Sequence, residues 1–218
     1  MTALDTDSAT PAERTDYWDH VYAEADTSRL PLPSQFATFV AGELAGQNRI
    51  VEFGSGSARD AVFFATYGHS VLGVDASEEA IDHSRVLVKN LGITAEFLAA
   101  SIGDDGIVER IGPGELPTVV YARFFVHAIT DEEEKRFLAV AAAITRPGDL
   151  LAVEYRTVRD RSGTKVTGRH YRRFVQPASF ESRALDHGFD VTYAVEGFGF
   201  AKYQDDDAYV ARTVFSRR

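Results

Sequence analysis

The sequence has no cysteine, so disulfide bonds and thiolate metal ligands are excluded. The absence of cysteine fits a reducing compartment, and we expect the protein to be cytoplasmic. No apolar run is long enough to span a membrane, and residues 1–7 lack the basic start and the apolar stretch of a secretory signal. We therefore expect no membrane partner.

Basic residues are scarce as well. The 218 residues include 23 Lys and Arg against 33 Asp and Glu, which gives a formal net charge of −10. Proteins that bind nucleic acid over a broad face cluster Lys and Arg to neutralise phosphates, so we expect no nucleic-acid partner. We expect a small-molecule substrate, for reasons given below, and the sequence does not identify the oligomeric state.

The chain has the length and the 44% hydrophobic content of one domain with a full core. The small, acidic residues 1–15 are expected to be disordered, and residues 16–218 to form the single domain. Within this domain, residues 16–48 predict an N-terminal helical cap, and residues 157–176 interrupt the regular pattern as a basic insertion.

From residue 49 onward, short apolar runs alternate with longer amphipathic ones. The short runs predict strands at 49–53, 70–74, 95–99, 118–124, 150–155, 191–197 and 209–216. The longer runs predict helices at 57–67, 78–91, 131–145 and 177–187. Strands that alternate with helices form a parallel sheet, whereas the last two strands lack a helix between them. The predicted fold class is α/β: a doubly wound, mostly parallel seven-stranded sheet with a C-terminal antiparallel hairpin and helices on both faces.

A glycine turn follows the first predicted strand. Gly54 and Gly56 stand where this strand ends, and glycine there allows a sharp turn and the close approach of a ligand. Asp75 lies 21 residues after Gly54, at the end of the next strand, where a carboxylate can accept both hydroxyls of a ribose. The pattern predicts a pocket for a ribose-bearing cofactor. The alternative is a turn without a ligand, in which Asp75 caps the following helix.

Two residues favour S-adenosylmethionine over a dinucleotide. The dinucleotide fingerprint has a third glycine at the position of Arg59, and a branched cation there would obstruct the pyrophosphate. Glu52 lies on the strand itself and would repel a pyrophosphate, but it suits a ligand that carries an ammonium or a sulfonium group.

With these residues the chain resembles the class I, Rossmann-like S-adenosylmethionine-dependent methyltransferases. The first motif of that family is an acidic residue and then alternating glycines, matched here by Glu52, Gly54 and Gly56, with Ala58 in place of a third glycine. The acid at the end of the second strand is matched by Asp75. The resemblance covers residues 50–218, and it implies a methyltransferase domain with S-adenosyl-L-methionine as its cofactor.

The resemblance also implies further cofactor contacts. The adenine would lie beside Ser101 and Ile102, in the loop after the third strand, and Ala76 follows the ribose-binding acid. Arg123, after the fourth strand, would pair with a carboxylate of the cofactor or the substrate, or neutralise one of the two acids as a structural ion pair.

An aromatic pair near the start of the chain is a further candidate. Trp18 and Tyr22 are four residues apart and share one face of a predicted helix. In many relatives an N-terminal helix closes over the cofactor, and cation–π contact with a sulfonium is physically sensible. Core packing is the alternative.

Candidates for catalysis follow the fourth and fifth strands and lie in the basic insertion. A hydroxyl acceptor gains from a general base, and we expect His127 in this role, with a solvent-facing or helix-capping histidine as the alternative. Glu154 and Arg156 point to one side of a strand and either grip a substrate group or form only an ion pair. His170 lies among the arginines of the insertion, which suit an anionic substrate but also fit a solvated hairpin or a subunit interface. The acidic run 205–207 predicts a solvated turn, and no spaced set of His, Asp and Glu marks a metal site.

These observations predict a methyltransferase that acts on a small anionic acceptor, such as a sugar, a nucleotide-sugar or a specialised metabolite, at a hydroxyl. The segment after the fourth strand lacks the Asn/Asp-Pro-Pro-aromatic motif of nucleic-acid amine methylators. One alternative is an S-adenosylmethionine-binding protein with other chemistry or a structural cofactor. A nicotinamide-dependent oxidoreductase is the other.

Overall fold

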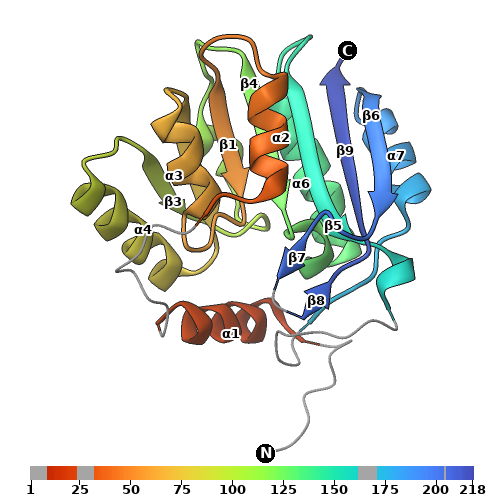
Figure 1. Cartoon of the computed structure of the whole chain (residues 1–218), viewed down its shortest axis with the longest axis horizontal. Coiled ribbons are helices and arrows are strands. Elements are labelled where there is room, and N and C mark those ends of the chain that lie inside the picture. The colour runs from red at the N-terminus through yellow and green to blue at the C-terminus, as the bar shows by residue number, and fades with distance from the viewer. Residues whose placement is uncertain (1–8, 24–31, 162–170, 204) are drawn as a thin grey trace, which may run out of the picture.

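A mixed sheet of seven strands forms the centre of the molecule (Figure 1). The computed structural model describes residues 9–23, 32–161, 171–203 and 205–218. The strand order is β3-β2-β1-β4-β5-β9-β6. The strands are β1 Arg49–Phe53, β2 Ser70–Asp75, β3 Glu96–Ala99, β4 Thr118–Arg123, β5 Leu150–Arg156, β6 Phe189–Gly197 and β9 Val210–Arg217. The first five strands are parallel, and β9 runs antiparallel to both β5 and β6, so the predicted fold class is confirmed.

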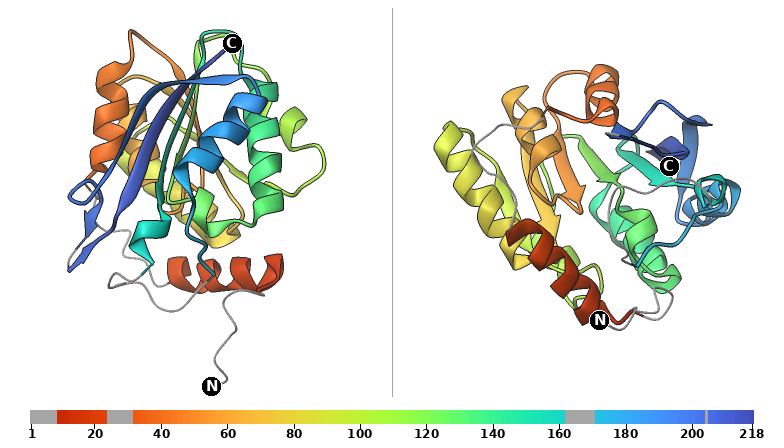
Figure 2. Two further views of the ribbon diagram at one scale, coloured as in Figure 1. Left: turned by 90° about the vertical axis from the view of Figure 1, so that its right-hand side faces the viewer. Right: turned by 60° about the horizontal axis from the view of Figure 1, so that its bottom comes forward.

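Helices cover both faces of this sheet (Figures 1 and 2). One face carries α2 Gln35–Glu43, α3 Arg59–Thr66 and α4 Glu78–Leu91, and the other carries α5 Ile107–Ile111, α6 Asp131–Ile144 and α7 Pro177–Asp186. Large side chains fill the two layers, with Phe36, Phe64 and Tyr121 in the first and Phe53, Phe137 and Phe180 in the second. Burying such side chains on both faces is the main force that holds a doubly wound sheet together. None of the described helices is long and apolar enough to cross a membrane.

Capping residues place the helix ends where the sequence predicts them. Ser77 accepts a hydrogen bond from the backbone N–H of Ala80 at the start of α4, and Gly92 ends this helix in a left-handed conformation. At the start of α6, Thr130 and Glu133 form a capping box. The short elements were not predicted, because α5, β7 Lys202–Tyr203 and β8 Asp206–Asp207 are too brief to show a periodic pattern.

The first helix corrects the prediction that residues 1–15 are disordered. Helix α1, Pro11–Ala23, begins inside that segment. Thr10 donates to Glu13 Oε2 from both its backbone N–H and its hydroxyl at 2.8 Å, and the Glu13 N–H donates back to Thr10 Oγ1 at 3.3 Å. This reciprocal cap, with Pro11 at the first helical position, starts the helix. Helix α1 then crosses the edge of the sheet where the parallel strands end (Figures 1 and 2).

The acidic run 205–207 is also different from the prediction of a solvated turn. Asp206 is buried, and its Oδ2 atom lies 2.5 Å from Arg156 Nη2. Asp160 accepts from Nη1 of the same guanidinium at 2.6 Å. One buried guanidinium thus donates to two buried carboxylates, an arrangement that a sequence pattern does not reveal.

Candidate functional site

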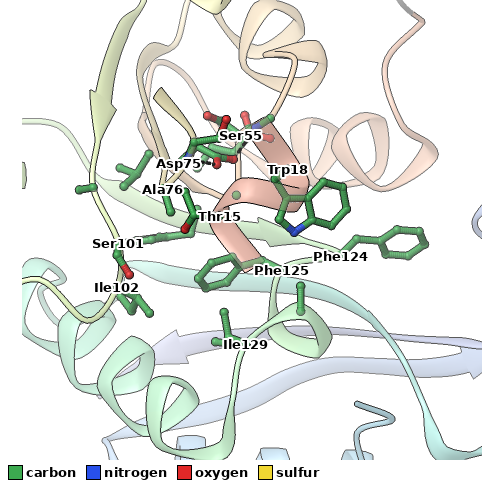
Figure 3. A pocket seen from close by; sticks show the side chains of 18 of the residues that line it. Thr15, Trp18, Ser55, Asp75, Ala76, Ser101, Ile102, Phe124, Phe125 and Ile129 are labelled. Carbon is green, nitrogen blue, oxygen red and sulfur yellow. Dashed lines mark hydrogen bonds between the residues drawn. The ribbon is translucent and has the colours of Figure 1, made fainter. Parts of the chain in front are cut away.

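A cavity of about 330 Å³ lies at the carboxyl ends of β1, β2 and β4, beneath α1 (Figure 3). Ligands of parallel sheets bind at this edge, where the turns after the strands converge. The residues predicted to contact the cofactor all line the cavity: Trp18, Tyr22, Glu52, Gly54, Gly56, Asp75, Ala76, Ser101, Ile102 and Arg123.

The glycine turn has the left-handed backbone that its sequence suggests. Gly54 and Gly56 have φ angles of +71° and +49°. The Gly54 N–H donates to the carbonyl of Val74 at 2.8 Å, which ties the turn to the end of β2. Ala58, at the place of the family's third glycine, also has a positive φ of +58°. A left-handed conformation costs an alanine roughly 1–2 kcal/mol, which explains why glycine is the usual residue there.

Asp75 joins the turn to the cavity. Its Oδ2 atom accepts the Gly56 N–H at 2.8 Å, and its Oδ1 atom accepts the Ser77 N–H at 3.0 Å. Burial raises the pKa of Asp75, and these backbone donors oppose the rise. A carboxylate has about four lone-pair positions, so two backbone donors leave acceptor capacity for the hydroxyls of a ribose.

Glu52 supplies a second, less satisfied carboxylate. It is 4% exposed, and no described residue donates a hydrogen bond to its Oε2 atom. Burial and the nearby charge of Asp60 raise the pKa of Glu52 well above its usual value, and Arg59 opposes them. A buried carboxylate oxygen without a donor is costly, and a cationic ligand removes that cost. The donor set therefore fits a cofactor with an ammonium group and a ribose.

We expect Glu52→Gln to flatten the pH dependence of stability in the ligand-free protein. The folded carboxyl keeps its proton at pH values where the unfolded carboxyl, with a pKa near 4.5, is already ionised. The unfolded state thus binds fewer protons, and wild-type stability falls as pH rises from 4.5 toward the raised folded pKa, by up to about 1.4 kcal/mol per pH unit. Urea unfolding at several pH values measures this slope. Equal slopes in both proteins would contradict the expectation.

Helix α1 closes the cavity with aromatic side chains. The rings of Trp18 and Tyr22 stack with centroids 5.9 Å apart. Burial raises the pKa of the Tyr22 phenol, whose oxygen lies against Gly56. The helix is fastened at two points, since Ser77 donates to Asp19 at 2.5 Å and Arg14 pairs with Glu133 at 2.5 Å.

Because Tyr22 lies so close, Gly56→Ala should loosen α1 and weaken binding of S-adenosylhomocysteine. A Cβ atom on Gly56 would lie 3.0 Å from Tyr22 Cζ and closer still to the phenol oxygen. Gly46→Ala is the matched control, because Gly46 has a similar φ of +68° but nothing within 4 Å of its added Cβ. We expect a lower melting temperature and weaker binding in Gly56→Ala than in Gly46→Ala, with partial rescue by Tyr22→Ala. No difference between the two alanine variants would refute the steric explanation.

Three of the four predicted catalytic residues, His127, Glu154 and Arg156, are not among the residues that line the cavity. His127 is 4% exposed and is not among the lining residues, and its Nδ1 atom accepts the Arg156 backbone N–H at 3.2 Å. Glu154 is fully buried between Arg123 and Arg212. Arg156 pairs with the buried acids described above and does not line the cavity either. His170 lies outside the described residues.

The basic insertion likewise does not reach the cavity through its described residues, 157–161 and 171–176. Arg173, for example, donates to the carbonyl of Val126 at 2.9 Å and pairs with the buried Glu134. The positive charge of Arg173 is therefore paired with acidic side chains of the fold.

Several lining residues were not predicted as contacts. They include Arg14, Thr15, Arg59, Phe125, Ile129 and Glu133. The Thr10–Glu13 capping signal would have extended α1 far enough to include Arg14 and Thr15. Arg59 was considered only as an obstacle to pyrophosphate, although it is the first residue of a helix that points at the site. Among the described residues, no group of three His, Asp or Glu is arranged to hold a metal ion.

Comparison with known proteins agrees with this geometry. Residues 50–148 match the family model of a methyltransferase domain. A search of curated protein sequences finds no match.

Three solved structures illustrate the likeness in fold. An S-adenosylmethionine-dependent, TehB-like methyltransferase of Corynebacterium glutamicum is 14% identical, with a TM-score of 0.65, over 96% of this chain and 100% of its own. The magnesium protoporphyrin IX methyltransferase of Synechocystis, with bound S-adenosylmethionine, is 14% identical, with a TM-score of 0.61, over 97% of this chain and 86% of its own. The [4+2]-cyclase SpnF is 12% identical, with a TM-score of 0.72, over 97% of this chain and 98% of its own. At these identities the likeness shows the fold.

Residues 50–148 are thus similar to a methyltransferase domain, and the chain has the Rossmann-like fold of S-adenosylmethionine-dependent methyltransferases.

Proposed function

We propose that this protein transfers a methyl group from S-adenosyl-L-methionine to a hydroxyl of a small, anionic acceptor. The observation that carries the proposal is the pair of acids at the strand ends. Asp75 retains acceptor capacity beside the glycine turn, and Glu52 has a buried oxygen without a donor. A ribose and an ammonium group satisfy these two carboxylates.

The other cofactor contacts follow from the cavity wall. Ser101 and Ile102 lie beyond Asp75 and Ala76 (Figure 3), where they would contact the adenine. Trp18 lies on the other side of the cavity from Ser101 (Figure 3), and its ring stacks on that of Tyr22; such an aromatic face favours a sulfonium. Bound in this way, the cofactor supplies an electrophilic methyl group.

The protein's own part in the reaction is mainly positioning. Displacement at the methyl carbon requires the acceptor oxygen to lie in line with the sulfur, and holding reactants so is a large source of rate. Helix α1 contributes Trp18 and Tyr22 to the cavity wall and would limit the access of water to bound reactants. No histidine lines the cavity among residues 9–23, 32–161, 171–203 and 205–218. We therefore propose that proximity, rather than a histidine base, provides most of the acceleration.

A second function is favoured by one comparison. The structure with the TM-score of 0.72 is described as a [4+2]-cyclase, so a chain of this fold can carry out chemistry other than methylation. In that case this protein would bind S-adenosylmethionine without consuming it.

Release of S-adenosylhomocysteine separates the two functions. The purified chain is incubated with S-adenosylmethionine and a panel of hydroxylated carboxylates and phosphates, each paired with an uncharged analogue. The proposal expects release of S-adenosylhomocysteine with one or more charged acceptors. Tight binding of S-adenosylmethionine with no release across the panel would favour the second function.

A further inference from the structure

Two arginines line the cavity with unused donors. Arg59 begins α3 and Arg123 ends β4, and their side chains are 29% and 17% exposed. Each uses its Nε atom on a neighbouring carboxylate, Arg59 on Asp60 at 3.2 Å and Arg123 on Glu154 at 2.8 Å. No described residue accepts a hydrogen bond from the Nη atoms of either arginine. Each guanidinium therefore has N–H groups left to bind an oxyanion.

The two arginines come from different elements of the cavity wall, Arg59 from α3 and Arg123 from β4. Burial and Asp60 raise the pKa of Glu52, and Arg59 opposes that rise more strongly than Arg123 does. The charge of Arg59 also opposes the rise that burial causes in the pKa of the Tyr22 phenol. This phenol lies against Gly56. Arg59 also follows the glycine turn directly in the chain, at the start of α3, whereas Arg123 stands at the end of β4 and pairs with Glu154. A carboxylate and a guanidinium placed together match the ammonium and the carboxylate of an amino acid.

Ion pairs with residues outside the cavity lining hold the Arg123 side chain in place. Glu154, which accepts its Nε–H, is 0% exposed and also accepts from Arg212 Nε at 2.6 Å. Arg212 in turn donates to the carbonyl of Phe200 at 2.7 Å. The centre of the Phe124 ring lies 4.3 Å from the Arg123 guanidinium. The backbone of Phe124 is left-handed, with a φ of +59°. Backbone strain of this kind persists where the surroundings enforce it, often at functional sites.

We propose that Arg123 binds an oxyanion of the methyl acceptor, a carboxylate or a phosphate, while Arg59 binds the carboxylate of the cofactor. Glu154 is a positioning residue, because it fixes the guanidinium of Arg123 without reaching the cavity. The proposal rests on the proposed function for the cofactor. The inference adds that Arg123 selects an anionic acceptor. Arg59 then binds the carboxylate of the cofactor, and Arg123 binds the oxyanion of the acceptor.

The cofactor half is tested with two ligands that differ at the amino-acid end. S-adenosylhomocysteine has the carboxylate, whereas 5′-methylthioadenosine has neither carboxylate nor ammonium. Calorimetry on the full chain should show that Arg59→Gln weakens S-adenosylhomocysteine binding by about 5- to 150-fold and leaves methylthioadenosine binding unchanged. Arg123→Gln should change both affinities by less than about threefold, as should Arg85→Gln on the outer face of α4. Loss of discrimination between the two ligands in Arg123→Gln would overturn the division of roles.

The acceptor half is tested with benzoate and phenyl phosphate. Trp18 is the only tryptophan and lines the cavity, so its fluorescence reports binding there. With S-adenosylhomocysteine saturating, we expect at least one of these anions to bind the wild type and benzyl alcohol not to bind. Arg123→Gln should abolish anion binding, and Arg123→Lys should weaken it because lysine lacks the planar fork. Equal binding by wild type and Arg123→Gln, or binding of neither anion by the wild type, would overturn the proposal.

The variant Glu154→Gln tests whether Glu154 positions the guanidinium of Arg123. Anion affinity should fall while S-adenosylhomocysteine affinity stays unchanged, whereas a general structural defect would lower both. Failure of the proposed function is recognised separately: the wild type would then bind no S-adenosylhomocysteine, whatever the anion titrations show.

Discussion

Glu154→Ala is expected to destabilise the folded protein by about 3–5 kcal/mol, the range for removing one partner of a buried ion pair. Glu154 is 0% exposed, and its two oxygens accept from Arg123 at 2.8 Å and from Arg212 at 2.6 Å. Without the carboxylate, the Arg212 side chain, which is 7% exposed, keeps a buried charge without a counter-ion. Equilibrium unfolding in urea measures the loss.

Glu132→Ala is the matched control for this change. Glu132 has a 74% exposed side chain and pairs with Lys135 at 3.1 Å on the surface of α6. Exposed pairs of this kind contribute at most about 1 kcal/mol. If Glu154→Ala costs no more than Glu132→Ala, the buried cluster does not have the structural role described here.

Asp75→Ala is expected to weaken binding of S-adenosylhomocysteine by about 1–3 kcal/mol, or about 5- to 150-fold. In the proposed binding mode the ribose would lose an acceptor for its hydroxyls, and the Gly56 N–H would lose the acceptor that holds it at 2.8 Å. Both losses weaken binding of the ligand, because Asp75 holds the glycine turn and is also expected to contact the ligand. Calorimetric titration of the two proteins gives the difference directly.

Asp82→Ala provides the comparison for Asp75→Ala. Asp82 lies on α4 with a 72% exposed side chain and pairs with Arg85 at 3.0 Å, away from the cavity. Its replacement should leave cofactor affinity unchanged. Equal affinities in the Asp75 and Asp82 variants would mean that Asp75 does not contact the ligand.

The part of the cavity wall at the ends of β1 and β2 could be predicted because it depends on local sequence. Glu52, Gly54, Gly56 and Asp75 follow directly from where two buried strands end, and the parallel sheet brings those ends together. The fold was predictable for the same reason, since alternating strand and helix patterns define a doubly wound sheet. Helix α1 carried a local signal too, the capping box at Thr10 and Glu13, which was missed.

The remaining side chains depend on partners far away in the sequence. Alternation along β5 correctly puts Glu154 and Arg156 on one side, but it does not show that Arg212 of β9 lies opposite Glu154 in the register. His127 follows β4 as expected, yet its ring is turned toward the backbone of Arg156. Whether a charged residue faces a cavity or a buried counter-ion is decided by tertiary packing, which one sequence does not encode in any short pattern.

The central claim is that the cavity beneath α1 binds S-adenosylmethionine through the ends of β1 and β2. Calorimetric titration of the full chain with S-adenosylhomocysteine and, separately, with NAD⁺ tests it most directly. The account predicts saturable one-to-one binding of S-adenosylhomocysteine that weakens in Asp75→Ala, and no binding of NAD⁺ at the same concentrations. Absence of S-adenosylhomocysteine binding, or a preference for NAD⁺, would contradict it.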